Sequence, residues 1–277
     1  IGIVLLGALG TAGFLNPSSQ SKPKPPSAAQ KVKCPFCSTI NAGSAKNCSS
    51  CRGNLDFASY PKVVRLTICE DRDIQACWGP AGKIAFTCSK RGDAIWVMNE
   101  DGSNLNRLPV ADSMGDFRPS WATNGKIAFS GGIVSQDIFI MDADGSNRKR
   151  LWDYSSTDTC PSMNREGTIV FASDRGRNSG FDLWMFDSSG QNEVQLTNDM
   201  GSNFNPCWSP DGKKIAFESD RGGNWDIYVM DADGKNATRI TKSPASEYDA
   251  SWGPDGRIAY VTQGKDSSEI MIMNSDG

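Results

Sequence analysis

A unit of about 44 residues is repeated five times in this 277-residue sequence. Each unit has an anchor position, which holds tryptophan four times and methionine once, and a glycine near its end. The anchors are Trp78, Trp121, Met163, Trp208 and Trp252. The glycines are Gly102, Gly145, Gly190, Gly234 and Gly277. Both landmarks advance by 42–45 residues from one unit to the next, so two independent markers indicate one structural repeat.

Short apolar segments alternate with turn residues inside each unit. Asparagine and glycine, which accept positive φ, mark hairpin turns at residues 124–125, 210–212 and 254–256. The apolar strands that follow are expected at residues 84–86, 127–129 and 215–217. Further strands, dense in β-branched and aromatic residues, are expected at residues 137–141 and 226–230. Outer strands are expected to begin at residues 150–151 and 239–241, and no sustained helical period appears in this region.

A single four-stranded unit cannot bury both faces of its sheet, whereas units packed radially can. The repeat therefore predicts an all-β fold, a β-propeller of five visible four-stranded blades over residues 62–277. In this fold the five anchor side chains fill the spaces between neighbouring blades.

Closure of the ring has two possible forms. Val64, Arg65, Leu66 and Thr67 have the pattern of an outer strand that lacks a blade, and the fifth unit reaches Gly277 without an outer strand. Residues 64–67 can supply the outer strand of the fifth blade. This pairing removes two sheet edges and gives a closed five-bladed ring. The alternative is a truncated six-bladed ring.

The fourth unit carries the fullest signature. It reads Trp-Ser-Pro-Asp-Gly-Lys-Lys-Ile-Ala-Phe at residues 208–217, then Ser-Asp-Arg at 219–221 and Asp-Ile-Tyr-Val-Met-Asp at 226–231. This pattern resembles the WD-like repeats of TolB-type propellers, and the resemblance covers residues 62–277. It is weaker in the third unit, where Met-Asn-Arg-Glu-Gly replaces Trp-Ser-Pro-Asp-Gly at 163–167. The resemblance implies a binding role outside the cytoplasm, or a propeller placed beside a separate catalytic domain.

Two Cys-x-x-Cys pairs precede the propeller. Cys34, Cys37, Cys48 and Cys51 can complete a tetrahedral thiolate site for a structural Zn²⁺. Residues 34–57 resemble the short zinc ribbons of bacterial multidomain proteins, except that Ser38 and Arg52 follow the pairs where glycine is common. Disulfides or a metal-free knuckle are the alternatives. The other cysteines are expected to be reduced thiols, because their number is odd: Cys69, Cys77, Cys88, Cys160 and Cys207.

The N-terminal region has two further segments. Residues 1–15 are almost wholly apolar or glycine, which is typical of the trailing part of a transmembrane helix or of a signal segment. Residues 16–33 form a Pro/Ser/Lys-rich linker that we expect to be disordered. Four lysines after the apolar segment favour a cytoplasmic side for the ribbon and the propeller, whereas the TolB resemblance favours an extracytoplasmic side, which we adopt.

Composition excludes several functions. The chain has no histidine, so neither Ser-His-Asp nor Cys-His catalysis is available within it. The net charge is −3 and the propeller has no basic stripe, which argues against nucleic acid as a partner. Paired aspartates recur at turns, as in Asp142 and Asp144, where backbone N–H groups rather than calcium are their expected partners. Ser-Asp-Arg motifs at residues 173–175 and 219–221 are expected to lock loops.

These observations predict a non-enzymatic, membrane-tethered scaffold with a monomeric propeller. A protein or peptide ligand is expected on one propeller face, where rim loops such as residues 131–135 and 177–180 differ between blades. Zn²⁺ is the one cofactor expected. The first alternative is a substrate-binding or gating propeller of a larger peptidase, with its catalytic domain beyond the C-terminus. The second is a carbohydrate-binding propeller.

Overall fold

The computed structural model separates the chain into two compact units, one with strands β1 and β2 and the other with strands β3 to β21. It describes residues 31–33, 40–42, 66–67, 72–89, 92–110, 115–132, 135–151, 155–176, 180–198, 201–264 and 267–277. In the first unit, β1 (Lys31–Lys33) pairs antiparallel with β2 (Ile40–Ala42). β1 takes up the last three residues of the predicted linker.

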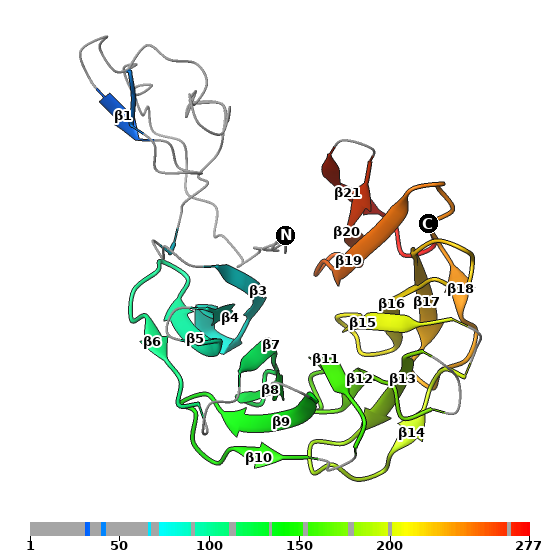
Figure 1. Cartoon of the computed structure of the whole chain (residues 1–277), viewed down its shortest axis with the longest axis horizontal. Helices are drawn as coiled ribbons and strands as arrows, with labels where there is room; N and C mark the ends of the chain where they lie inside the picture. The colour runs from blue at the N-terminus through cyan, green and yellow to red at the C-terminus, as the bar shows by residue number, and fades with distance from the viewer. Residues whose placement is uncertain are drawn as a thin grey trace, which may run out of the picture. The chain divides into compact units, whose positions relative to one another are not determined.

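The second unit consists of five antiparallel sheets in chain order, which are the predicted blades (Figure 1). Blade one is β3 (Asp73–Trp78), β4 (Lys83–Cys88), β5 (Ala94–Asn99) and β6 (Asn106–Arg107), with a short 3₁₀ turn, η1 (Pro80–Gly82). Blade two is β7 (Asp116–Trp121), β8 (Lys126–Gly131), β9 (Asp137–Asp142) and β10 (Lys149–Arg150). Blade three is β11 (Asp158–Met163), β12 (Ile169–Ser173), β13 (Asp182–Phe186) and β14 (Val194–Gln195).

Blade four is β15 (Asn203–Trp208), β16 (Lys214–Ser219), β17 (Asp226–Asp231) and β18 (Thr238–Arg239). Among the described residues, blade five consists of β19 (Ser246–Trp252), β20 (Ile258–Gln263) and β21 (Ser268–Met273). The predicted five-bladed all-β propeller is therefore confirmed, and the described part of its fifth blade is a three-stranded sheet.

The segment expected to complete blade five lies mostly outside the described residues. Val64 and Arg65 are not among them, while Leu66 and Thr67 are described and belong to no strand. In the described part of the chain, β21 pairs with β20 alone. Closure of the ring by this segment stays a prediction.

The anchor side chains of blades two to five pack between blades, as predicted, and the same packing of Trp78 in blade one stays a prediction. Met163 of blade three lies in a core with Ala128 and Ile138 of blade two, and Trp252 of blade five packs against Ala216 and Ile227 of blade four. Trp121 packs so closely on blade one that a Cβ atom built on Gly79 would lie 2.3 Å from its ring, so only glycine fits there. Successive blades are thus joined by continuous apolar cores.

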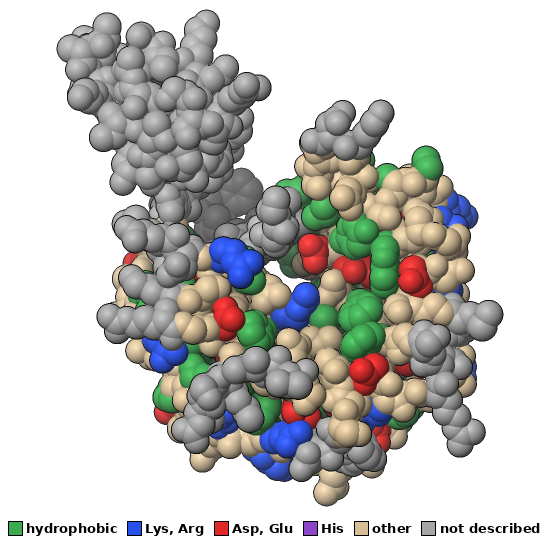
Figure 2. All heavy atoms as spheres, in the orientation of Figure 1, with side chains coloured by type: hydrophobic (Ala, Val, Ile, Leu, Met, Phe, Trp, Pro, Cys, Tyr) green, Lys and Arg blue, Asp and Glu red, His purple; other side chains and the backbone are tan. Residues whose placement is uncertain are grey.

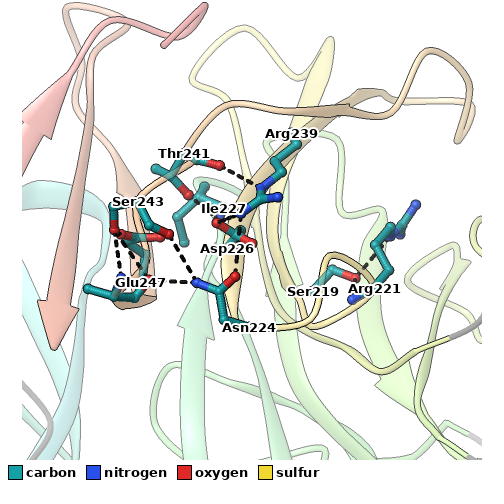
Figure 3. A network of polar contacts seen from close by, with 10 residues as sticks. Ser219, Arg221, Asn224, Asp226, Ile227, Arg239, Thr241, Ser243 and Glu247 are labelled. Carbon is teal, nitrogen blue, oxygen red and sulfur yellow. Dashed lines mark hydrogen bonds and ion pairs between the residues drawn. The ribbon is translucent and has the colours of Figure 1, made fainter.

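Polar side chains also hold the outer strand of blade four to its sheet. Figure 3 shows the junction of blades four and five, where Asp226, Arg239, Thr241 and Glu247 gather from β17, β19 and the end of β18. Arg239 Nη2 lies 2.8 Å from Asp226 Oδ1, and Thr241 Oγ1 accepts a hydrogen bond from the Ile227 backbone N–H at 2.8 Å. The outer strand is therefore held to its blade by charge as well as by its backbone ladder.

Candidate functional site

Every blade has the same backbone irregularity in its first strand. The pairing of first and second strands shifts register at one residue, which we call the bulge residue. The bulge residues are Gln75, Arg118, Cys160, Asn205 and Asp249. Their φ angles lie between 46° and 56°, in the left-handed region that side chains other than glycine rarely adopt. A conformation that costs about 1–2 kcal/mol per residue is thus kept five times.

The bulge residues surround one pocket at the centre of the propeller. Its volume is about 300 Å³, and each blade lines it with the bulge residue and the next two residues of the first strand. Figure 2 shows a hollow where these strands converge, in the orientation of Figure 1. The second lining position holds alanine or proline, and the third holds serine or cysteine. Chemical variety in the pocket therefore comes mainly from the bulge residues.

A chain of hydrogen bonds crosses the pocket from blade two to blade five. Arg118 Nη1 donates to Asn205 Oδ1 at 2.7 Å, and Asn205 Nδ2 donates to Glu218 Oε1 at 2.8 Å. The same Glu218 oxygen accepts from the Asp249 backbone N–H at 2.6 Å. The Arg118 side chain reaches from blade two to Asn205 of blade four, because the bulge residue of blade three, Cys160, has a short side chain. The network fixes the guanidinium group of Arg118 in place.

In blade one, Gln75 and Thr87 form a smaller group of hydrogen bonds. Gln75 Oε1 accepts from Thr87 Oγ1 at 3.2 Å and from the Arg118 backbone N–H at 3.2 Å. The amide NH₂ group of Gln75 is left as a donor beside Arg118. Donor groups thus lie on blades one and two, and acidic groups on blades four and five.

Glu218 is a buried carboxyl group next to the pocket. Its side chain is 3% exposed, and burial raises its pKa to about 7, against hydrogen bonds from Asn205 and the Asp249 backbone that lower it. The equivalent second-strand positions hold Thr87, Ser130, Ala172 and Val261, none of which is ionisable near neutral pH. Glu218 is therefore a feature of blade four and not of the repeat.

The serine before the anchor joins neighbouring blades in blades two and three. Ser120 Oγ accepts from the Met163 backbone N–H at 2.9 Å, and Ser162 Oγ accepts from the Trp208 backbone N–H at 3.3 Å. Cys77 and Cys207 hold the same position, and burial raises the pKa of both thiols, that of Cys77 to about 12. These cysteines are free, as predicted, and their neutral thiols are poor nucleophiles.

The four predicted zinc ligands, Cys34, Cys37, Cys48 and Cys51, lie outside the described residues. Among the residues that the structure does describe, no group of three or more histidine, cysteine or acidic side chains could hold a metal ion. The described part of the chain also has no helix that is long and apolar enough to cross a membrane, and residues 1–15 are not in that part.

The Ser-Asp-Arg motifs lock loops as predicted, but their aspartate and arginine do so separately. Asp220 Oδ1 accepts from the Ser202 backbone N–H at 2.7 Å, while Arg221 donates through Nε to Ser219 Oγ at 2.9 Å and through Nη2 to Asn203 Oδ1 at 2.7 Å. In blade three, Arg175 pairs with Asp158 and Glu193. The motif is architectural.

The turn aspartates accept backbone N–H groups, also as predicted. Asp144 Oδ1 accepts from Ser146 N at 2.9 Å, and Asp211 Oδ1 accepts from Lys213 N at 3.1 Å. Hydrogen bonds from nearby side chains and backbone lower the pKa of both carboxyl groups. Neither residue faces the central pocket.

The pocket residues carry only a weak signal in the sequence. Each bulge residue lies three positions before its anchor, and the two positions between them hold only alanine, proline, serine or cysteine. When the five repeats are compared, the bulge position varies widely while the next two positions hold few residue types. The sequence prediction did not include this position.

Comparison with known proteins agrees with this architecture. Residues 176–277 match the TolB beta propeller domain family. The matched segment contains strands β13 to β21 of the propeller. No curated protein matches the chain.

Solved structures share the fold of this propeller at low sequence identity. A putative TolB from Agrobacterium tumefaciens is 18% identical with a TM-score of 0.65, over 76% of this chain and 80% of that one. TolB from Acinetobacter baumannii is 21% identical with a TM-score of 0.66, over 76% of this chain and 54% of that one. A puromycin-hydrolyzing peptidase from Mycobacterium tuberculosis is 12% identical with a TM-score of 0.58, over 74% of this chain and only 35% of that one.

Proposed function

We propose that this chain is a non-enzymatic scaffold that binds a protein or peptide on the propeller face around the central pocket. The observation that carries the proposal is the ring of five bulge residues, which keep one strained backbone conformation and yet differ in charge, size and polarity. A strained backbone conformation that is kept in every blade is typical of a functional surface. Variable side chains on a rigid scaffold are typical of recognition.

The chemistry around the pocket supports binding over catalysis. The cysteine thiols that line it are neutral because burial raises their pKa, and the chain has no histidine to activate them. Glu218 Oε1 already accepts two hydrogen bonds, from Asn205 and from the Asp249 backbone. These contacts are consistent with a group that organises the pocket.

We extend the proposal to the N-terminal region from the sequence pattern alone. Cys34, Cys37, Cys48 and Cys51 hold a structural Zn²⁺ in a ribbon over residues 34–57, which serves as an accessory contact module. Residues 1–15 tether the chain to a membrane, with the propeller on the extracytoplasmic side. Metal analysis of the reduced, folded chain tests the zinc module.

A second candidate is the substrate-binding or gating propeller of a peptidase. The likeness to the puromycin-hydrolyzing peptidase and to prolyl endopeptidases favours it, because those matches cover only 35% and 34% of the respective chains. In that case the pocket face would contact peptide substrates in place of a stable partner.

A crosslinking pull-down with a matched pair of variants tests the scaffold. The full chain, Arg118→Ala and Lys235→Ala serve as baits against membrane, periplasmic and cytosolic fractions; Lys235 lies on an exposed turn. We expect one envelope protein to be captured by the full chain and by Lys235→Ala, and at least about tenfold less by Arg118→Ala. Equal capture by both variants, or no specific capture, contradicts the proposal.

A further inference from the structure

The central pocket contains one cation and one anion that do not pair with each other. Among the described residues that line it, Arg118 of blade two and Asp249 of blade five are the charged ones. Within the described ranges, neither side chain forms a salt bridge. Arg148, by contrast, pairs with buried Asp116 at 2.7 Å. Two half-buried opposite charges that face one pocket without pairing offer complementary sites to a ligand.

Arg118 is prepared for an anionic group. Its Nη1 atom is held by Asn205 Oδ1 at 2.7 Å, and Asn205 is held in turn by Glu218. A guanidinium group has five N–H donors in a planar fork that matches a carboxylate, and one contact leaves most of them unused. The NH₂ group of Gln75 adds a neutral donor, because Gln75 Oε1 is bound to the Arg118 backbone N–H. Little side-chain freedom remains to be lost on binding.

Asp249 is prepared for a cationic group. Its backbone N–H donates to Glu218 at 2.6 Å, which fixes the residue in its left-handed conformation. Its carboxylate has no hydrogen bond or ion pair to another described residue and lines the pocket. An alkylammonium group, with three N–H donors, suits such a carboxylate.

We propose that the central pocket binds a small zwitterion, with its carboxylate on Arg118 and its ammonium group on Asp249. The two binding groups are linked through Asn205 and Glu218, which places them within one small site. The volume of about 300 Å³ is at the lower end for ligand pockets, and suits a free amino acid or a dipeptide better than a folded segment. A small-molecule site of this kind goes beyond the proposed binding of a protein partner.

Calorimetric titration of the full chain with glycylglycine tests the charge requirement. Two analogues serve as matched ligands: N-acetyl-glycylglycine lacks the ammonium group, and glycylglycine amide lacks the carboxylate. We expect saturable binding of glycylglycine and at least about tenfold weaker binding of each analogue. Free glycine, titrated in parallel, distinguishes a free amino acid from a dipeptide as the ligand. The tighter ligand is the one whose ammonium and carboxylate groups are separated as Asp249 and Arg118 require.

Variants of the two charged residues test the location. Arg118→Gln and Asp249→Asn remove one charge each, and both new residue types already occupy bulge positions in this chain. Arg257→Gln and Asp255→Asn make the same changes in an exposed turn pair and serve as controls. We expect each pocket variant to weaken glycylglycine binding by at least about tenfold and the controls to leave it unchanged. Absence of saturable binding up to about 10 mM, equal binding of the capped analogues, or indifference to both pocket substitutions overturns the proposal.

Discussion

The buried carboxyl group of Glu218 makes the stability of the propeller depend on pH. Replacement by glutamine keeps an oxygen that accepts from Asn205 Nδ2 and from the Asp249 backbone N–H, and removes the ionisable proton. The shape of the site is conserved, so packing contributes little to the comparison. The Glu218→Gln variant therefore isolates the cost of a buried negative charge.

The magnitude follows from the raised pKa. In the folded chain the pKa of Glu218 is about 7, against 4.5 in its ordinary environment, so the folded state holds a proton that the unfolded state loses. Stability is thus lost as the pH rises from about 4.5 to about 7, by about 3 kcal/mol at roughly 1.4 kcal/mol per pKa unit. Above this range the loss is complete and constant. Glutamine has no such loss.

Urea unfolding at several pH values between about 5 and 8 measures the difference in free energy of unfolding between variant and wild type. We expect the two proteins to be similar near pH 5, and Glu218→Gln to be more stable by up to about 3 kcal/mol near pH 8. Glu269→Gln changes an exposed carboxylate on β21 and is the control, for which we expect a flat difference. A flat difference for Glu218→Gln, or a variant that is less stable at high pH, would refute the reasoning.

Two other predictions concern a blade junction and the cysteine pairs. Asp226 Oδ2 and Glu247 Oε2 are buried without hydrogen-bond partners, and burial raises the pKa of Glu247. In blade four the position of Glu247 is held by Asn203, which donates a hydrogen bond to Asp182. We expect Glu247→Gln to gain unfolding free energy relative to wild type between about pH 5 and pH 8, measured by urea titration; a pH-independent difference contradicts this. We expect about one Zn²⁺ per reduced chain by elemental analysis, and its loss in Cys34→Ser; a folded, reduced chain without zinc contradicts the ribbon.

The repeat made the blades predictable. The Trp208 unit contains its own turn at Gly212, its own apolar strand and its own anchor, so local signals agree with the fold that neighbouring units complete. The packing of anchors between blades followed from the same argument, since a lone sheet leaves one face uncovered.

The site was less predictable because it depends on geometry between strands. The bulge at Asn205 is a shift in the pairing of β15 with β16, and no residue type in the strand requires it. The raised pKa of Glu218 arises from burial in the folded propeller, against hydrogen bonds from Asn205 and the Asp249 backbone that lower it. The sequence shows these residues as ordinary polar positions in apolar strands.

The repeated bulge also makes the pocket modular. Since the backbone shift recurs with five different side chains, from Cys160 to Arg118, the fold does not depend on which side chain occupies the position. The backbone conformation limits which residue types can occupy the bulge position. β-Branched residues are strongly disfavoured at positive φ, whereas asparagine, aspartate and glycine are tolerated well. The pocket can therefore exchange one recognition chemistry for another by single substitutions, with the surrounding strands left in register.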